Sequence, residues 1–141
     1  MPADEREEGF LHTCKARGVA GISVKSKADE YYMMEYHDYI EKILKENPEA
    51  DGIFASSDII AAQVIQVCNR MGIRIPDKMK LVGFDDVNVA ALTTPSITTI
   101  RQPVKEIADM AVDLLIRSAQ GEVIPTKVVL PVKLVVREST N

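Results

Sequence analysis

The sequence has little that would support redox, cysteine–metal or membrane chemistry. It contains two cysteines, Cys14 and Cys68, and no C-x-x-C pair. We therefore expect two reduced, largely buried thiols in a cytosolic protein, with no metal site. No apolar run approaches the about 20 residues that span a bilayer. The start, MPADEREEGF, is acidic and has no apolar signal region.

Positive charge is also sparse. The 141 residues carry a formal net charge of −4, and lysine and arginine form no extended cluster. This excludes a surface built to neutralise DNA phosphates, so any contact with nucleic acid requires another part of the protein. The length suits one domain or one lobe of a larger protein. With 46% hydrophobic residues, the chain can bury a core.

Motifs of catalysis and nucleotide binding are missing as well. The chain has no G-x-S-x-G, no G-x-G-x-x-G and no Walker loop. Both histidines, His12 and His37, lie among polar residues of predicted helices, which favours the surface over a catalytic role. We therefore expect no enzyme activity and no cofactor.

The sequence does contain alternating predicted strands and helices. Helical composition or apolar spacing indicates helices at Asp4–Arg17, Asp29–Glu46, from Ser56 or Ser57 to Gly72, Asn88–Leu92 and Pro103–Ala119. Strands are predicted at 19–24, within 52–58 where the strand runs into a helix, at 80–84 and at 98–100, with a final extended segment at 126–140. The predicted buried face of the last helix is Val104, Ile107, Ala108, Ala111, Leu114 and Leu115.

This alternation predicts an α/β fold, with a mostly parallel sheet and helices on both faces. Ligands of such sheets bind beyond the carboxyl ends of the strands. Two polar clusters follow predicted strands, namely Ser56-Ser57-Asp58 and Asp85-Asp86. Both are expected at one edge of the sheet, where they would form a site.

The acid pair in KLVGFDDV allows three interpretations: a metal site, acid–base or phosphoryl-transfer chemistry, or binding of ligand hydroxyls. In extended backbone, Asp85 and Asp86 point to opposite faces, and only Asp58 is a possible third acid, which disfavours metal and phosphoryl transfer. Hydroxyl binding remains, with Asp86 expected to cap the following turn or to tether the neighbouring loop. Candidate ligand-binding groups are Asp85, Ser57, Arg6, Gln102 and Tyr31. Simpler roles stay open: Ser57 as a helix cap, Arg6 as a solvated charge and Tyr31 at the core edge.

Several segments together resemble the LacI/GalR family of transcriptional regulators. They are EREEGF at the start, DGIFASSDIIAAQVIQVCNRMGIRIPDKMKLVGFDDV, TPSITTIRQPVKEIADMAVDLLI and LPVKLVVREST. The resemblance runs from about residue 4 to residue 141, and the order of VGFDD, TTIRQP and LVVREST is specific to that family.

The resemblance implies a domain organisation. Residues 1–141 would form the C-terminal lobe of a periplasmic-binding-protein-like (type I) effector domain. The family's DNA-binding head, hinge and most of its first lobe have no counterpart here. The strand that precedes the R-x-x-G-F helix in the family is also missing from this sequence.

The resemblance also implies roles for single residues. The effector contacts of the family fall on Arg6, Tyr31, Ser57, Asp85 and Gln102, although many members have Asn at the position of Ser57. The segment around Gln102 returns the chain toward the first lobe. Dimer contacts fall on Tyr32, Met33, Tyr36, Ala62, Val89 and Leu92, and core packing is an equally good interpretation for the first three.

The implied function is binding of a small sugar or sugar derivative between two lobes, which would alter the affinity of a homodimeric cytoplasmic repressor for operator DNA. The alternative is an extracytoplasmic sugar-binding protein of a transport system, which would have the same fold and site. The REST-type ending favours the regulator.

Overall fold

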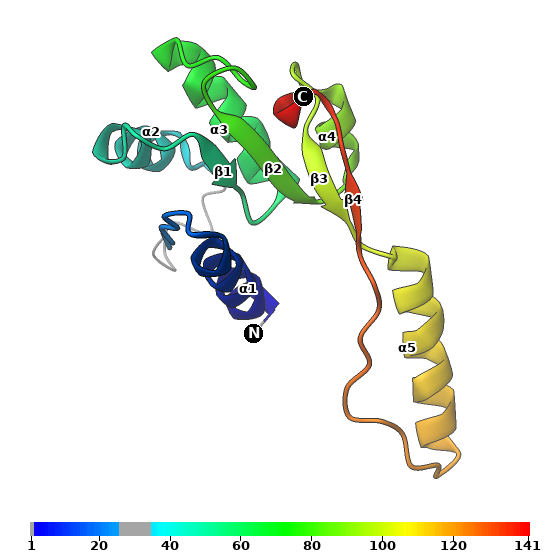
Figure 1. Ribbon diagram of the computed structural model, residues 1–141. Helices are drawn as coiled ribbons and strands as arrows, with labels where there is room; N and C mark the ends of the chain where they lie inside the picture. The colour runs from blue at the N-terminus through cyan, green and yellow to red at the C-terminus, as the bar shows by residue number, and fades with distance from the viewer. Residues whose placement is uncertain (1, 26–34) are drawn as a thin grey trace. The chain divides into compact units, whose positions relative to one another are not determined.

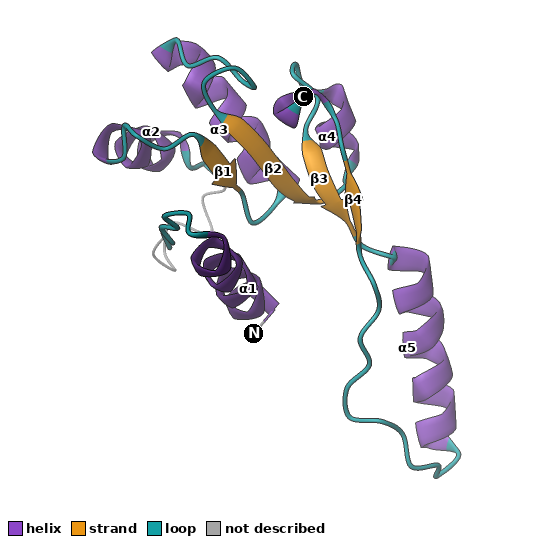
Figure 2. Cartoon of the chain, in the orientation of Figure 1, coloured by secondary structure: helices purple, strands orange, loops and turns teal. Residues whose placement is uncertain are grey.

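A computed structural model describes residues 2–25 and 35–141, with the side chains of residues 2 and 3 left undescribed. It divides into two compact units, Met1–Glu46 and Asn47–Asn141. Figure 1 follows the chain through both units, and Figure 2 separates helices, strands and loops.

The first unit contains helices α1 (Pro2–Arg17) and α2 (His37–Glu46). Acidic residues lie in the first turn of α1 and basic residues in its last turn, which complements the helix dipole. After the helix, Ser23 and Lys25 bind the Glu7 carboxylate at 2.6 and 2.5 Å.

Two expectations for this unit need correction or remain open. The strand predicted at 19–24 is wrong, because the structure has a loop at 19–25. This loop bonds back to α1 through Ser23 and Lys25, and none of its residues enters the described sheet. The helix predicted from Asp29 begins at His37, while residues 29–34 lie outside the described part of the chain.

The second unit is built on a four-stranded sheet in the order β1-β2-β3-β4. Its strands are β1 (Gly52–Phe54), β2 (Lys80–Asp85), β3 (Thr98–Arg101) and β4 (Lys133–Val135). Strands β1, β2 and β3 run parallel to one another and β4 is antiparallel to β3, so the predicted mostly parallel sheet is confirmed. The register pairs Asp85 with Arg101, which brings the carboxyl ends of β2 and β3 level.

Helices α3 (Asp58–Met71) and α4 (Asn88–Leu92) connect the parallel strands, and α3 packs against β2 and α4. The predicted ends of α3 are confirmed. The Ser57 hydroxyl accepts the Ile60 amide at its start, and Gly72 ends it with a φ of 71°. The apolar residues buried around it include Leu81, Ile97, Val67, Val64, Ala61 and Cys68. Burial raises the pKa of the Cys68 thiol to about 11.

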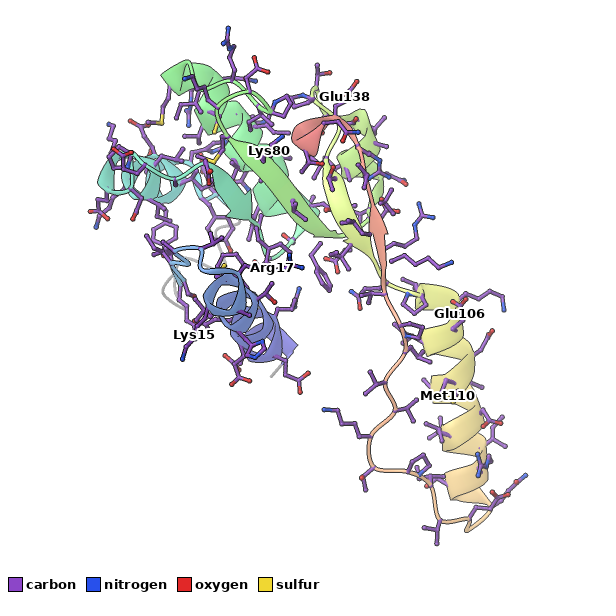
Figure 3. The ribbon with its side chains drawn as sticks, in the orientation of Figure 1. Lys15, Arg17, Lys80, Glu106, Met110 and Glu138 are labelled. Carbon is purple, nitrogen blue, oxygen red and sulfur yellow. The ribbon has the colours of Figure 1, made fainter. Side chains whose placement is uncertain are left out.

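Helix α5 (Val104–Ala119) and the loop that follows it form an arm (residues 104–132), which leaves the sheet after β3 and returns at β4 (Figures 1 and 2). The predicted buried face of this helix is wrong. All 16 residues of α5 are described and none is buried; Leu115 is 71% exposed. Glu106 and Met110 are both labelled on this helix in Figure 3. The apolar spacing of α5 therefore predicts the helix correctly, but its apolar face has no covering within this unit.

After β4 the chain ends in a short 3-10 helix, η2 (Glu138–Thr140), which contacts β2 and β3. The Ser139 hydroxyl donates to the Leu81 carbonyl at 2.6 Å and accepts the Thr98 amide at 2.8 Å. Glu138 accepts the amide and hydroxyl of Ser96, and Lys80 donates to the Thr140 carbonyl. Figure 3 labels Glu138 of this helix and Lys80 of β2. The C-terminal residues thus tie the returning chain to the two central strands.

Candidate functional site

The candidate site begins at the carboxyl end of β2. The expected alternation of Asp85 and Asp86 in extended backbone is wrong, because their φ angles are 103° and 58°. Both residues occupy the left-handed region, which non-glycine residues seldom adopt, although Asp tolerates it better than most. The two acids nevertheless accept hydrogen bonds from different partners.

Asp85 is paired with Gln102, the residue that follows β3. The Gln102 side-chain nitrogen donates to the Asp85 carboxylate at 2.6 Å, and both residues are half-buried. A carboxylate can accept about four hydrogen bonds, and the amide oxygen of Gln102 can accept two. The pair therefore keeps capacity for hydroxyl groups of a ligand at this edge.

Ser57 follows β1 at the same edge of the sheet, because β1, β2 and β3 run parallel. Its hydroxyl oxygen accepts the Ile60 amide at 3.3 Å. The helix-cap role left open by the sequence is therefore confirmed. A hydroxyl that accepts one hydrogen bond can still donate its own proton, so capping and ligand binding are compatible.

Asp86 lies beside this edge and binds two arginines. Its carboxylate is 2.5 Å from Nε of Arg101 and 2.6 Å from a terminal nitrogen of Arg137, and its side chain is 6% exposed. Burial raises the pKa of this carboxyl, but hydrogen bonds from Arg137 and Arg101, with their charges, outweigh it and hold the pKa below its usual value. Asp86 thus tethers β3 and the C-terminal segment and does not cap the following turn.

The residue whose role sequence reasoning missed is Asp58, which the sequence offers only as a possible third acid in the cluster after the first of these strands. Its side chain is fully buried; one oxygen accepts the Thr99 hydroxyl at 2.5 Å and the other the Val87 amide at 2.9 Å. Asp58 therefore links α3, β3 and the loop before α4. The glycine of VGFDD was the available signal, since a Cβ on Gly83 would overlap the Asp58 carboxylate.

The described candidate residues are divided between the two units. Arg6 is half-buried on α1 in the first unit, and Tyr31 lies outside the described residues. Asp85, Gln102 and Ser57 all belong to the second unit. Only these three can be assigned to one sheet edge.

The candidate dimer residues are similarly scattered. Tyr32 and Met33 lie outside the described residues, and Tyr36 is buried. Ala62 and Val89 are half-buried on α3 and α4. Leu92, at the end of α4, is 80% exposed and is therefore available to another chain.

Two general features of the described residues bear on the chemistry. Across 2–25 and 35–141, no group of three or more His, Cys, Asp or Glu side chains is placed to hold a metal ion. In the same residues, no helix is both long and apolar enough to cross a bilayer. The Asp85 carboxylate accepts a hydrogen bond from the Gln102 amide, and the Asp86 carboxylate pairs with the guanidinium groups of Arg101 and Arg137.

The chain is similar to one domain family and to bacterial operon regulators. Residues 1–140 match the periplasmic binding protein-like domain family. The ribose operon repressor of Halalkalibacterium halodurans is 36% identical over 141 residues, which cover 99% of this chain and 42% of the repressor. The NTD biosynthesis operon regulator of Bacillus subtilis is 38% identical, with 96% and 42% covered. The chain thus spans less than half the length of these relatives.

Solved structures agree with this assignment. A periplasmic binding protein/LacI transcriptional regulator from Alkaliphilus metalliredigens, complexed with D-xylulofuranose, is 31% identical. It superposes with a TM-score of 0.77 over 96% of this chain and 51% of its own. The sheet, the polar edge and these matches together identify the chain as a member of the periplasmic binding protein-like domain family, of the kind found in LacI/GalR repressors.

Proposed function

We propose that this chain is the C-terminal lobe of the effector-binding domain of a LacI/GalR-type transcriptional regulator. The observation that carries the proposal is the Asp85–Gln102 pair at the carboxyl edge of a parallel sheet, where ligands of such folds bind. The repressors matched along nearly the whole chain favour a regulator over a transport protein.

The proposed effector is a small sugar or sugar derivative. Asp85 accepts hydroxyl protons, Gln102 both donates and accepts, and Ser57 donates its hydroxyl proton. Neighbouring hydroxyls of a sugar ring both donate and accept hydrogen bonds, which suits this set of groups. Arg6 and Tyr31 are proposed as further contacts, with Arg6 donating to ring oxygens and Tyr31 lying against an apolar sugar face.

Regulation would follow from a shift between two arrangements of the effector domain. An effector that binds one arrangement more tightly shifts the population toward it, and linkage carries this shift to the affinity for operator DNA. Operator contact belongs to a DNA-binding head outside these residues, because this chain is acidic. The exposed apolar side chains of the arm suit contact with a further lobe.

The remaining parts of the proposal concern setting and partners. The regulator acts in the cytoplasm as a homodimer, with no catalysis and no metal or cofactor. Ala62, Val89 and Leu92 are proposed as interface residues, together with Tyr32, Met33 and Tyr36. The exposure of Leu92 is the structural feature that best suits such an interface.

Calorimetric titration of the complete gene product with a panel of mono- and disaccharides tests this function. We expect one sugar to bind with micromolar affinity, and Asp85→Ala to weaken it about ten- to a hundredfold through loss of a charged hydrogen-bond acceptor. Asp77→Ala is the matched control, because Asp77 pairs on the surface with Arg74. An unchanged affinity in Asp85→Ala would show that the site is assigned wrongly.

A further inference from the structure

Each residue of the proposed ligand-binding pair is covalently next to a member of an ion pair. Asp85 precedes Asp86, and Gln102 follows Arg101. The ends of β2 and β3 are therefore bridged twice, by Asp85–Gln102 at 2.6 Å and by Asp86–Arg101 at 2.5 Å. The position of the first bridge depends on the backbone that the second one holds.

Arg137 adds a third anchor to the same carboxylate. One terminal nitrogen donates to Asp86 at 2.6 Å and the other to the Ile97 carbonyl at 2.8 Å, while the Arg137 amide donates to the Thr98 hydroxyl at 2.8 Å. Arg137 is thus fixed by two further hydrogen bonds besides its contact with Asp86. The guanidinium group of Arg137 therefore has a fixed position, and its ion pair with Asp86 can restrain the carboxyl end of β2.

The backbone conformation of Asp85 and Asp86 needs contacts that stabilise it. Two consecutive non-glycine residues with φ of 103° and 58° are unfavourable on their own, and such conformations persist only where their surroundings impose them. Asp58 fixes the next peptide by accepting the Val87 amide at 2.9 Å. Asp86 is the acid in this turn whose contacts reach both β3 and the C-terminal segment.

We propose that Asp86 is a positioning residue: with Arg101 and Arg137, it holds the turn so that the Asp85 carboxylate and the Gln102 amide converge. The ligand role of Asp85 and Gln102 rests on the proposed function, but their alignment does not. Arg101 ends the strand that leads into the arm, and Arg137 lies just after the strand that leads out of it. The same ion pairs therefore connect the site to both segments that join the sheet to the arm.

The test uses the side-chain amide signals of Gln102 in the ¹⁵N-labelled chain, with no ligand present. Asp86→Asn is the informative variant, because Asn tolerates the left-handed backbone but lacks the charge that both arginines bind. We expect the Gln102 signals to move to the positions of a solvent-exposed glutamine. Their hydrogen exchange should become about tenfold faster, as expected when a hydrogen bond to a charged group is lost.

Two controls separate positioning from general destabilisation. Asp77→Asn makes the same chemical change in a surface ion pair, and Ser139→Ala weakens the same unit through Leu81 and Thr98 without removing a partner of Asp86. Neither should move the Gln102 signals. If Ser139→Ala moved them as far as Asp86→Asn at equal loss of stability, Asp86 would be only a structural residue.

Arg101→Gln keeps the proposal testable if Asp86→Asn does not fold. The Arg101 side chain is 56% exposed, so its replacement leaves little buried surface unfilled. We expect a smaller shift of the Gln102 signals in the same direction. Unchanged signals in a folded Asp86→Asn or Arg101→Gln protein would overturn the proposal. Failure of sugar binding alone would contradict the proposed function and leave this result intact.

Discussion

At the scale of single residues, the structure of the second unit depends on the hydrogen-bond donors of two carboxylates, Asp58 and Asp86. Asp58 is fully buried and accepts hydrogen bonds from Thr99 and Val87, while Asp86 accepts them from two arginines. A buried carboxylate that lost such donors would carry a large desolvation penalty. Gly83 and Asp86 of VGFDD therefore act together with Asp58 as one structural group around Asp85.

Gly83→Ala tests the close approach of Asp58 to β2. A Cβ at this position would overlap the Asp58 carboxylate and lie 3.2 Å from a methyl carbon of Ile97, in a buried region. We expect a loss of about 1–3 kcal/mol in the free energy of unfolding, measured with urea. Gly52→Ala on the neighbouring strand is the control, because the nearest atom to its Cβ is 3.9 Å away. Equal effects of the two substitutions would contradict this role for Gly83.

The ion pairs of Asp86 should make part of the stability dependent on pH. Because the two arginines lower its pKa in the folded chain, its contribution is complete above the unfolded pKa of about 4 and is lost as the pH falls through the folded pKa. The difference in unfolding free energy between the wild type and Asp86→Asn should be largest near neutral pH. It should shrink in acid, as measured by urea unfolding at several pH values. A difference that stays constant into acid would exclude an ionised Asp86 as its source.

At the scale of elements, the sequence predicts local structure well where the partners are near in the chain. Ser57 and Gly72 mark the ends of α3, and the apolar run before Asp85 marks β2. The strand expected at 19–24 is not formed, because an apolar run becomes a strand only beside another strand. Ser23 of this segment bonds instead to Glu7 of α1. The apolar face of α5 was predicted from its spacing, but spacing does not say which surface covers it.

The site shows the same limit. The pairing of Asp85 with Gln102 follows from two parallel strands that end level, so the common edge was predictable. The left-handed turn and the two arginines on Asp86 were not, because they depend on Arg137, which is 51 residues from Asp86 along the chain.

The C-terminal helix η2 offers a prediction at this scale. Ser139→Ala removes an acceptor from the Thr98 amide and a donor from the Leu81 carbonyl, at a fully buried position. We expect the free energy of unfolding to fall by about 1–3 kcal/mol, measured by chemical denaturation. Ser118→Ala, on the exposed surface of α5, should change it by less than about 0.5 kcal/mol. An unchanged free energy of unfolding in Ser139→Ala would mean that the Ser139 hydrogen bonds do not stabilise the packing of η2 on β2 and β3.

At the scale of the whole molecule, the arm is the unusual feature of the second unit. Its large exposed hydrophobic residues are Val104, Ile107, Met110, Val112, Leu115, Ile116, Val123, Val128, Val129 and Val132. Exposed apolar patches of this kind mark surfaces that contact another lobe or chain, or that aggregate. The sheet has its own buried core, so substitutions in the exposed arm should affect the stability of the unit less than substitutions in that core.

We expect the isolated chain to bind the fluorescent dye ANS through the arm. Leu115→Glu together with Val112→Glu should lower the ANS fluorescence, because charge replaces exposed apolar surface. The urea midpoint should change little, since neither residue is buried. Leu92→Glu, on α4 outside the arm, should leave most of the fluorescence. Equal fluorescence in the double variant would show that the dye binds elsewhere.

The central claim is that Asp85 and Gln102 form part of a sugar-binding site. The most direct measurement is an NMR titration of the ¹⁵N-labelled 141-residue chain with a panel of mono- and disaccharides, following the Asp85 backbone amide and the Gln102 side-chain amide. One lobe supplies only part of the contacts, so we predict weak binding with a Kd of about 1 mM or higher. At least one sugar should shift both signals toward saturation, and in Asp85→Ala the Gln102 signal should no longer respond. Shifts that persist in Asp85→Ala, or a panel in which no sugar moves either signal, would contradict the claim.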